Sequence, residues 1–249
     1  MGNIFFRDSV LNDTYGGRDL LKLGKTAQSV AEQVRNNDFS DLYIGDYFTT
    51  DINNRQIKWH IADFNYFLNI GDTIFTKPHL VLINDVSLME VSVNNTDTTE
   101  GGYYNSNIKK NMLPICLSNL KKTDLGNYIL THRDLFTNRI NDKISSSGCP
   151  AWLGCSVDYG WYNSTIELLT EPQVYGTAVY GSSGFDIGTG YTQFSIFKLN
   201  KKFTYMIRQW WWLRSVASHN MFCGVSSFGW ASADMASKPG SVRIYFCFG

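Results

Sequence analysis

The hydrophobic pattern near the N-terminus has the period of an α-helix. Between residues 18 and 38, apolar side chains recur every three or four positions, with polar side chains between them. This pattern predicts an amphipathic helix, which must cover its apolar face by docking on the rest of the chain or by self-association. We therefore assign residues 1–38 to an N-terminal arm for attachment or oligomerisation. Its apolar positions are Leu20, Leu21, Leu23, Ala27, Val30, Ala31 and Val34.

The pattern changes to β-like alternation at Phe39, where we place the start of the main domain, residues 39–249. The alternating segments are separated by polar loops, and one helical run follows a possible N-cap at Asn105 or Ser106. These patterns predict an α+β, strand-dominated domain with long loops. The expected elements are a hairpin that turns at 52–56, a buried strand at 79–85, a helix at 105–120, a strand leading into a short helix at 128–140, and Gly/Ser-rich loops at 145–195.

Residues 209–249 begin and end with strongly apolar strands. In the first strand, Trp210, Trp212 and Arg214 alternate with Trp211, Leu213 and Ser215, so both faces are expected to be buried. In the last strand, Val242, Ile244, Phe246 and Phe248 alternate with Arg243, Tyr245 and Cys247 in the same way. A short third strand is expected at 222–225, with turns at Gly229 and Gly240. The remaining residues of the segment are then expected on loops or on the outer face of this sheet.

Composition narrows the class of function. The formal net charge is zero, which argues against nucleic-acid binding and membrane-surface attraction, and no apolar run approaches the length of a membrane span. Charged residues make up 18% of the chain and aromatic residues 15%. Rigid aromatic side chains among small polar ones are typical of antibody binding loops. The same mixture also suits an ordinary exposed β-loop surface.

Catalytic and metal-binding motifs are not evident. The four histidines lie far apart without metal-ligand spacing, and no nucleotide-binding loop or nucleophile elbow occurs. His132 beside Asp134 is interpreted as a capping or core histidine, and the five scattered cysteines as structural or incidental. The stretch Thr170–Gly176 is interpreted as a helix end broken by Pro172. We therefore expect a protein without catalytic residues, metal or cofactor.

The C-terminal motifs resemble a known family. The stretch WWWLRSV, then Phe222, Cys223, Val225 and Gly229, and the terminal GSVRIYFCFG are similar to the variable domain of diversity-generating-retroelement target proteins. Upstream stretches such as IADFNYFLNIGDT and ILTHRDLFTNRI resemble prophage-encoded tail proteins of gut bacteria that end in this domain. The resemblance covers residues 39–249. It implies a C-type lectin fold, in the variant shared with formylglycine-generating enzymes, preceded here by the N-terminal helical arm.

The resemblance also implies a division of roles within residues 209–249, in which a fixed scaffold displays a hypervariable ligand-binding surface. Met221, Trp230, Met235 and Lys238 cannot arise by adenine mutagenesis of asparagine codons, so these positions are fixed, derive from other codons, or belong to a copy that is no longer diversified. The scaffold would comprise Trp212, Leu213, Arg214, Phe222, Val225, Gly229, Val242 and Arg243. The ligand-binding residues would be Ala217, His219, Asn220, Gly224, Ser226, Phe228, Trp230, Ser232, Asp234 and Lys238.

The function implied is that of a phage tail-fibre tip or receptor-binding protein. Its partners would be a host cell-surface protein or glycan and other virion proteins, and we expect a homotrimer in the phage tail or, alternatively, at the bacterial cell surface. One alternative is a structural virion protein of the baseplate or capsid with the same fold. Another is an oxidase of the formylglycine-generating type, which would need Cys223 and Cys247 as an active cysteine pair.

Overall fold

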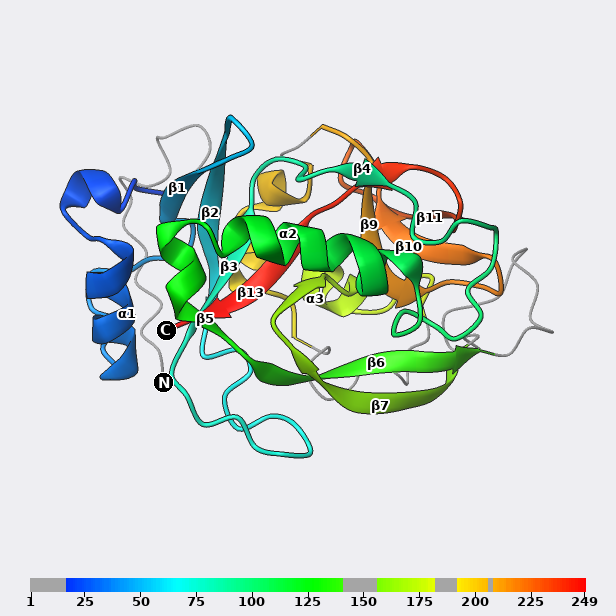
Figure 1. The fold of residues 1–249 in the computed structure, drawn as a ribbon, viewed down its shortest axis with the longest axis horizontal. Helices are drawn as coiled ribbons and strands as arrows, with labels where there is room; N and C mark the ends of the chain where they lie inside the picture. The colour runs from blue at the N-terminus through cyan, green and yellow to red at the C-terminus, as the bar shows by residue number, and fades with distance from the viewer. Residues whose placement is uncertain (1–16, 141–155, 182–191, 206–207) are drawn as a thin grey trace.

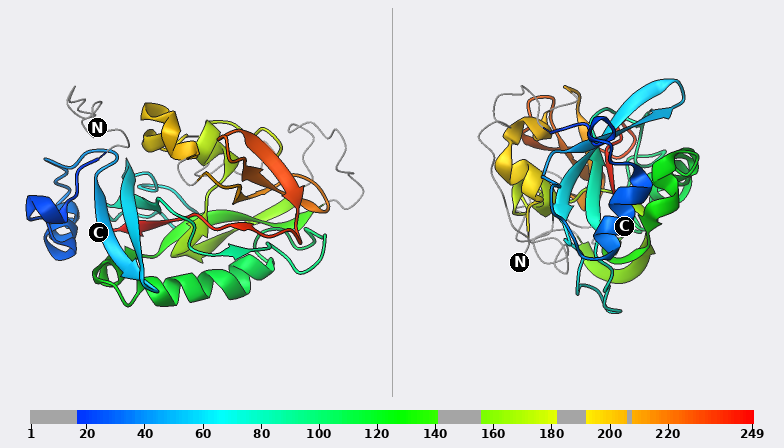
Figure 2. Two further views of the ribbon diagram at one scale, coloured as in Figure 1. Left: turned by 90° about the horizontal axis from the view of Figure 1, so that it is seen from above. Right: turned by 90° about the vertical axis from the view of Figure 1, so that its left-hand side faces the viewer.

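The computed structural model describes residues 17–140, 156–181, 192–205 and 208–249 (Figure 1). These residues form a mixed α/β structure in which strands predominate and the mainly antiparallel sheets are curled (Figure 2). The expected α+β, strand-rich class is confirmed at this level. The helical segments are η2 (Leu21–Leu23), α1 (Ala27–Arg35), η3 (Ile108–Met112), α2 (Leu113–Leu120), η4 (Asp124–Tyr128), α3 (Glu171–Tyr175), α4 (Ser195–Leu199) and η5 (Lys201–Thr204).

The first sheet is built around the C-terminal strand. Its order is β1-β2-β3-β13-β5, and β8 also pairs with β13, with every pairing antiparallel. The predicted hairpin is confirmed, because β1 and β2 meet at Asn53 and Asn54, whose positive φ angles of 52° and 60° suit a two-residue turn. The strands are β1 (Tyr47–Ile52), β2 (Arg55–Phe64), β3 (Leu80–Asn84), β5 (Ile129–Leu130), β8 (Ile166–Leu168) and β13 (Ile244–Phe248).

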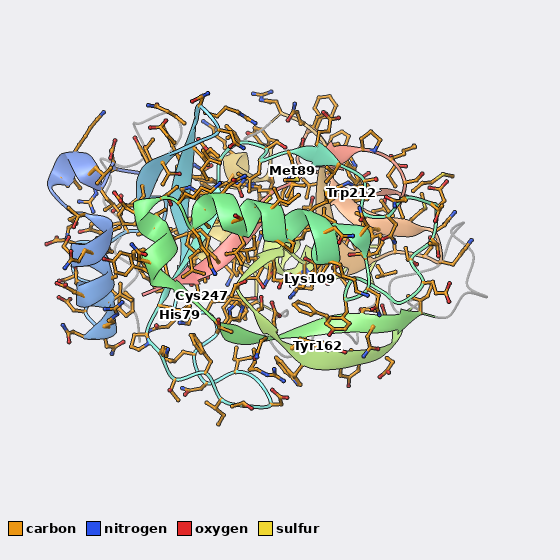
Figure 3. The ribbon with its side chains drawn as sticks, viewed as in Figure 1. His79, Met89, Lys109, Tyr162, Trp212 and Cys247 are labelled. Carbon is orange, nitrogen blue, oxygen red and sulfur yellow. The ribbon has the colours of Figure 1, made fainter. Side chains whose placement is uncertain are left out.

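The second sheet has the order β11-β10-β9-β12-β4, and β6 pairs with β7 in a separate two-stranded ribbon. Trp212, labelled in Figure 3, joins the strands β9 and β4, because its Nε1 donates a hydrogen bond to the Val91 carbonyl at 3.0 Å. The strands are β4 (Glu90–Val91), β6 (His132–Ile140), β7 (Ser156–Ser164), β9 (Trp211–Val216), β10 (Met221–Val225), β11 (Ala231–Met235) and β12 (Gly240–Ser241).

Alternation along β13 divides the core in two. Ile244, Phe246 and Phe248 enter one buried cluster, whereas Tyr245 and Cys247 enter the other. The strand β9 divides its side chains in the same way and is buried along its whole length. The two-faced burial expected for both strands is therefore confirmed. In Figure 1, α2 lies across the front of the sheets and contributes to the first cluster.

The N-terminal helix docks on the main body. The α1 side chains Ala27, Val30, Ala31 and Val34 are buried in the first cluster, and the Arg35 guanidinium donates to the Gly249 carbonyl at 3.3 Å. In the structure, the helix therefore covers its apolar face by docking on the rest of the chain.

Four local expectations are wrong. Residues 156–164 lie within the segment expected to form loops, but they form the strand β7. Residues 132–140 form the strand β6 instead of a helix, because they pair along their length with β7. The stretch beginning at Thr170 starts a helix rather than ending one: the Thr170 hydroxyl caps the Gln173 amide, and Pro172 occupies the first turn, where its missing N–H is tolerated. Gly240 lies in β12 rather than in a turn.

Candidate functional site

The candidate site is the hairpin formed by β10 and β11, which ends the second sheet in Figure 1. The strand β9 supports the hairpin from the interior, whereas β11 is the outermost strand. The predicted third strand is confirmed as β10, and β11 shows that part of the expected loop after Trp230 is also a strand.

The tip of the hairpin is a compact turn fixed by hydrogen bonds. The Ser226 amide donates to the Trp230 carbonyl at 2.8 Å, and the Ser226 hydroxyl oxygen accepts from the Trp230 amide at 3.1 Å. Gly229 has a φ of 84°, which favours glycine, and its carbonyl accepts from the Tyr175 hydroxyl. A Cβ at Gly229 would also lie 2.5 Å from the Thr204 hydroxyl oxygen. The turn is therefore held both internally and by contacts outside the hairpin.

This fixed turn presents two aromatic side chains to solvent. Phe228 is 70% exposed and Trp230 is 71% exposed, more than any other large apolar side chain in the described ranges. Their ring centroids lie 5.7 Å apart with an interplanar angle of 36°. Exposed aromatic groups on a rigid support are suited to binding, because they bury a large area with little loss of side-chain freedom.

The other predicted binding residues lie along the hairpin and at its base. The base is tied to the rest of the fold: the Thr99 amide donates to the His219 carbonyl, and the Ala236 amide donates to the Asn220 carbonyl. Lys238 forms an ion pair with Asp234 at 2.7 Å. The predicted residues that are partly or largely exposed are His219, Asn220, Ser226, Phe228, Trp230, Ser232, Asp234 and Lys238.

Ala217 and Gly224 are not on this surface, so the prediction that they are displayed is wrong. Ala217 packs in the second core cluster and is 8% exposed. Gly224 is buried beneath Trp210, and a Cβ at Gly224 would lie 2.1 Å from the indole ring. A Cβ at Gly240 on β12 would meet the same ring at 2.7 Å. The two glycines therefore leave the space that this indole occupies.

The predicted scaffold residues are buried, apart from the partly buried turn residue Gly229. Arg214 on β9 donates to both carboxylate oxygens of Asp134 at 2.8 Å, and the Tyr245 hydroxyl donates to the same carboxylate. Burial opposes ionisation of Asp134, but the Arg214 charge and its hydrogen bonds outweigh that effect and hold the pKa of the carboxyl group well below its usual range. This buried cluster joins β6, β9 and β13 behind the hairpin.

Arg243, the second buried arginine, is held mainly by neutral groups. Its Nε donates to the Asn84 carbonyl at 2.8 Å, and its guanidinium carbon lies 5.1 Å from the centroid of a Trp211 ring. Burial lowers the pKa of Arg243 to about 9. Its role in the described structure is to fill and cross-link the core, in agreement with the predicted scaffold role.

A buried carboxylate that the sequence did not single out stabilises the neighbouring loop. Glu171 accepts hydrogen bonds from the amides of Val179, Tyr180 and Gly181, at 2.7 Å for Gly181. The Glu171 amide in turn donates to the Ser215 hydroxyl oxygen on β9 at 3.1 Å. No local sequence signal identifies these contacts, because the carboxylate and its donors are separated by a loop whose path depends on the fold.

The groups considered for catalysis are buried. His132 lies between aromatic rings of the core, which agrees with its interpretation as a core histidine, and its Nε2 is 3.7 Å from Asp134. Cys223 and Cys247 are fully buried, and burial raises the pKa of Cys247 well above its ordinary value. Cys149 and Cys155 lie outside the described residues.

Within the described ranges, no group of three or more His, Cys, Asp or Glu side chains is placed to hold a metal ion. In the same part of the chain, no helix combines the length and the apolar character that a membrane span requires.

Comparison with known proteins gives no family assignment. No protein-family model, no curated protein and no solved structure matches the chain.

Proposed function

We propose that this chain is a receptor-binding protein of a phage tail, with a C-type lectin-like fold of the formylglycine-generating-enzyme variant, and that the β10–β11 hairpin contacts a host surface protein or glycan. The motifs of the two apolar C-terminal strands support the fold, and the hairpin supports the function. A homotrimer would present several such hairpins and gain avidity from repeated weak contacts.

The observation that carries the proposal is the exposed pair Phe228 and Trp230 on a fixed turn. Leaving two large aromatic side chains in water gives up the hydrophobic stabilisation that burial would supply, so their exposure is not explained by folding. Tryptophan in particular is enriched among residues whose truncation costs about 2 kcal/mol or more of binding free energy. The small polar neighbours Ser226 and Ser227 allow a partner to approach both rings.

The turn's hydrogen bonds are made largely by backbone groups, by Ser226 and by residues outside the hairpin. Side chains at positions 228 and 230 can therefore be exchanged without loss of these bonds. A hypervariable binding surface requires that the variable side chains differ from the groups that hold the turn in place.

The test is binding of labelled full-length protein to a panel of gut bacterial isolates. Phe228→Ala and Trp230→Ala should each weaken binding by about tenfold or more, since hot-spot truncations reach that size. Ile115→Ala is the matched control, because Ile115 is an apolar side chain that is 49% exposed on α2, outside the hairpin. Equal binding by all variants, or equal loss with Ile115→Ala, would contradict the proposal.

Deep sequencing of the 3′ end of the gene in a propagated lineage tests diversification separately. Differences should concentrate at the codons of the exposed residues His219, Asn220, Ser226, Phe228, Ser232 and Asp234. The buried Ala217 and Gly224 should stay constant with the scaffold. A uniform segment would favour a static structural role in the virion. In that case the hairpin should be protected from protease in assembled particles.

A further inference from the structure

The outer edge of β1, at the end of the molecule opposite to β11 (Figures 1 and 2), already pairs with a short piece of chain. The Tyr47 amide donates to the Arg18 carbonyl at 2.9 Å, and the Leu20 amide donates to the Tyr47 carbonyl at 3.0 Å. Asp19 and Tyr47 thereby form a parallel bridge. The backbone groups of Tyr47 must therefore point away from β2.

The register of β1 against β2 determines which other residues of β1 point their backbone N–H and C=O groups outward. In an antiparallel pair, residues alternate between facing the partner and facing outward, so Thr49 and Asp51 present their N–H and C=O groups to the same edge as Tyr47. The chain does not follow β1 to reach them, because the Leu20 carbonyl accepts from Leu23 and Lys25 as the chain turns into η2. Within the described ranges, no residue pairs with these backbone groups of Thr49 and Asp51.

A groove lies along this unpaired stretch, with a volume of about 310 Å³. The β1 residues Thr49 and Asp51 line it together with Leu21 and Thr26 from the N-terminal segment and Lys122 and Leu125 from the region of η4. The walls therefore combine apolar and hydroxyl groups with one cation, Lys122, and two carboxylates, Asp51 and Asp124. An exposed strand edge is normally blocked or paired in natural proteins, and an open edge beside a groove is the arrangement that strand addition uses.

We propose that this groove binds an extended peptide segment of a partner protein, which continues the strand begun by Arg18–Leu20 and pairs with Thr49 and Asp51. The existing bridge at Tyr47 shows that this edge accepts a parallel strand. Alternating backbone donors and acceptors are complementary to a polypeptide backbone, rather than to a sugar or a nucleic acid. The proposal does not depend on the hairpin's function.

Because β1, which lines the groove, and the hairpin strands β10 and β11 lie toward opposite ends of the molecule (Figure 1), the groove and the hairpin can be occupied together. One end would then hold a partner chain while the other remains accessible. Small or β-branched side chains at alternate positions of the peptide suit the threonine and leucine walls.

The test is selection of peptides from a random display library on the full chain, followed by affinity measurement on two proline variants. Thr49→Pro removes one outward N–H and no hydrogen bond to β2, which is the place where an edge strand tolerates proline. Ala233→Pro is the matched control on β11. The Ser226 amide donates to the Trp230 carbonyl, and the Ala236 amide donates to the Asn220 carbonyl, so the even-numbered residues of this strand face β10. The backbone groups of Ala233 therefore face outward, like those of Thr49. Thr49→Pro should weaken the selected peptides by about tenfold, and Ala233→Pro should not.

A second measurement needs no variant. Amide hydrogen exchange at Thr49 and Asp51 should be fast in the isolated protein and slow with a selected peptide. The proposal is overturned if no peptide is selected, if the peptides bind Thr49→Pro as tightly as the wild type, or if only Ala233→Pro weakens them. It is equally overturned if both amides are already protected in the isolated monomer, or if Thr49→Pro dissociates a dimer, since the chain itself would then occupy the edge.

Discussion

Replacing Asp134 with asparagine should destabilise the fold strongly, because the change removes the counter-charge that is hydrogen-bonded to the buried Arg214 guanidinium. The Arg214 side chain is 3% exposed, and Asp134 accepts from both of its terminal nitrogens at 2.8 Å. Removing one partner of a buried ion pair costs about 3–5 kcal/mol. With a urea m-value of about 3 kcal/mol per molar, the unfolding midpoint should fall by about 1 M or more.

The chain supplies a matched control one residue away. Arg133 also donates two hydrogen bonds to a carboxylate, from Nε and Nη2 to the two oxygens of Asp72 at 2.7 Å, but this pair lies at the surface, where Asp72 is 44% exposed. Water replaces the lost contacts there, so Asp72→Asn should leave the midpoint almost unchanged. The Asp134 and Asp72 variants therefore differ mainly in burial.

Urea unfolding followed by tryptophan fluorescence measures both variants, because Trp211 and Trp212 are buried in the cores behind the hairpin. The argument is refuted if the two substitutions shift the midpoint equally, or if Asp134→Asn shifts it by less than Asp72→Asn. Tyr245→Phe, which removes one hydrogen bond to Asp134 and no charge, should fall between them with a cost of about 1 kcal/mol.

Three further predictions follow from buried groups. Gly224→Ala should cost about 1–3 kcal/mol in urea unfolding, because the new methyl group overlaps the Trp210 ring; an unchanged midpoint would show that the ring moves freely. Burial lowers the pKa of His60 and of His79 from 6.5 to about 4, so the unfolded chain binds protons first as the pH falls through this interval. Each imidazole should then lower the free energy of unfolding by up to about 3 kcal/mol by about pH 4. NMR titration measures the two pKa values, and urea midpoints measure the stability. The prediction is contradicted if both histidines titrate near 6.5, or if the urea midpoint does not fall between pH 6.5 and pH 4. Thr170→Ala removes the N-cap of α3 and should cost about 1 kcal/mol, with Thr170→Ser as the variant that retains the cap.

The sequence specified those features that depend on local periodicity. Apolar positions in 211–216 and 244–248 alternate on both faces, and the structure places them in the two clusters that this alternation requires. The Asn53-Asn54 turn was likewise predictable, because asparagine tolerates the positive φ that such a turn needs. The resemblance of the C-terminal motifs, carried over position by position, places Phe228 and Trp230 on the displayed surface, and both side chains are exposed in the structure.

Tertiary structure decided the features that depend on contacts between distant segments. Gly224 appeared to belong to the displayed surface, and only the position of the Trp210 ring shows that it is buried. Residues 132–140 form a strand because β7, which begins only at Ser156, pairs with them, and no pattern within residues 132–140 indicates that partner. The open edge at Thr49 has the same origin: local alternation determines which way its amide points, whereas the path of the rest of the chain determines whether anything covers it.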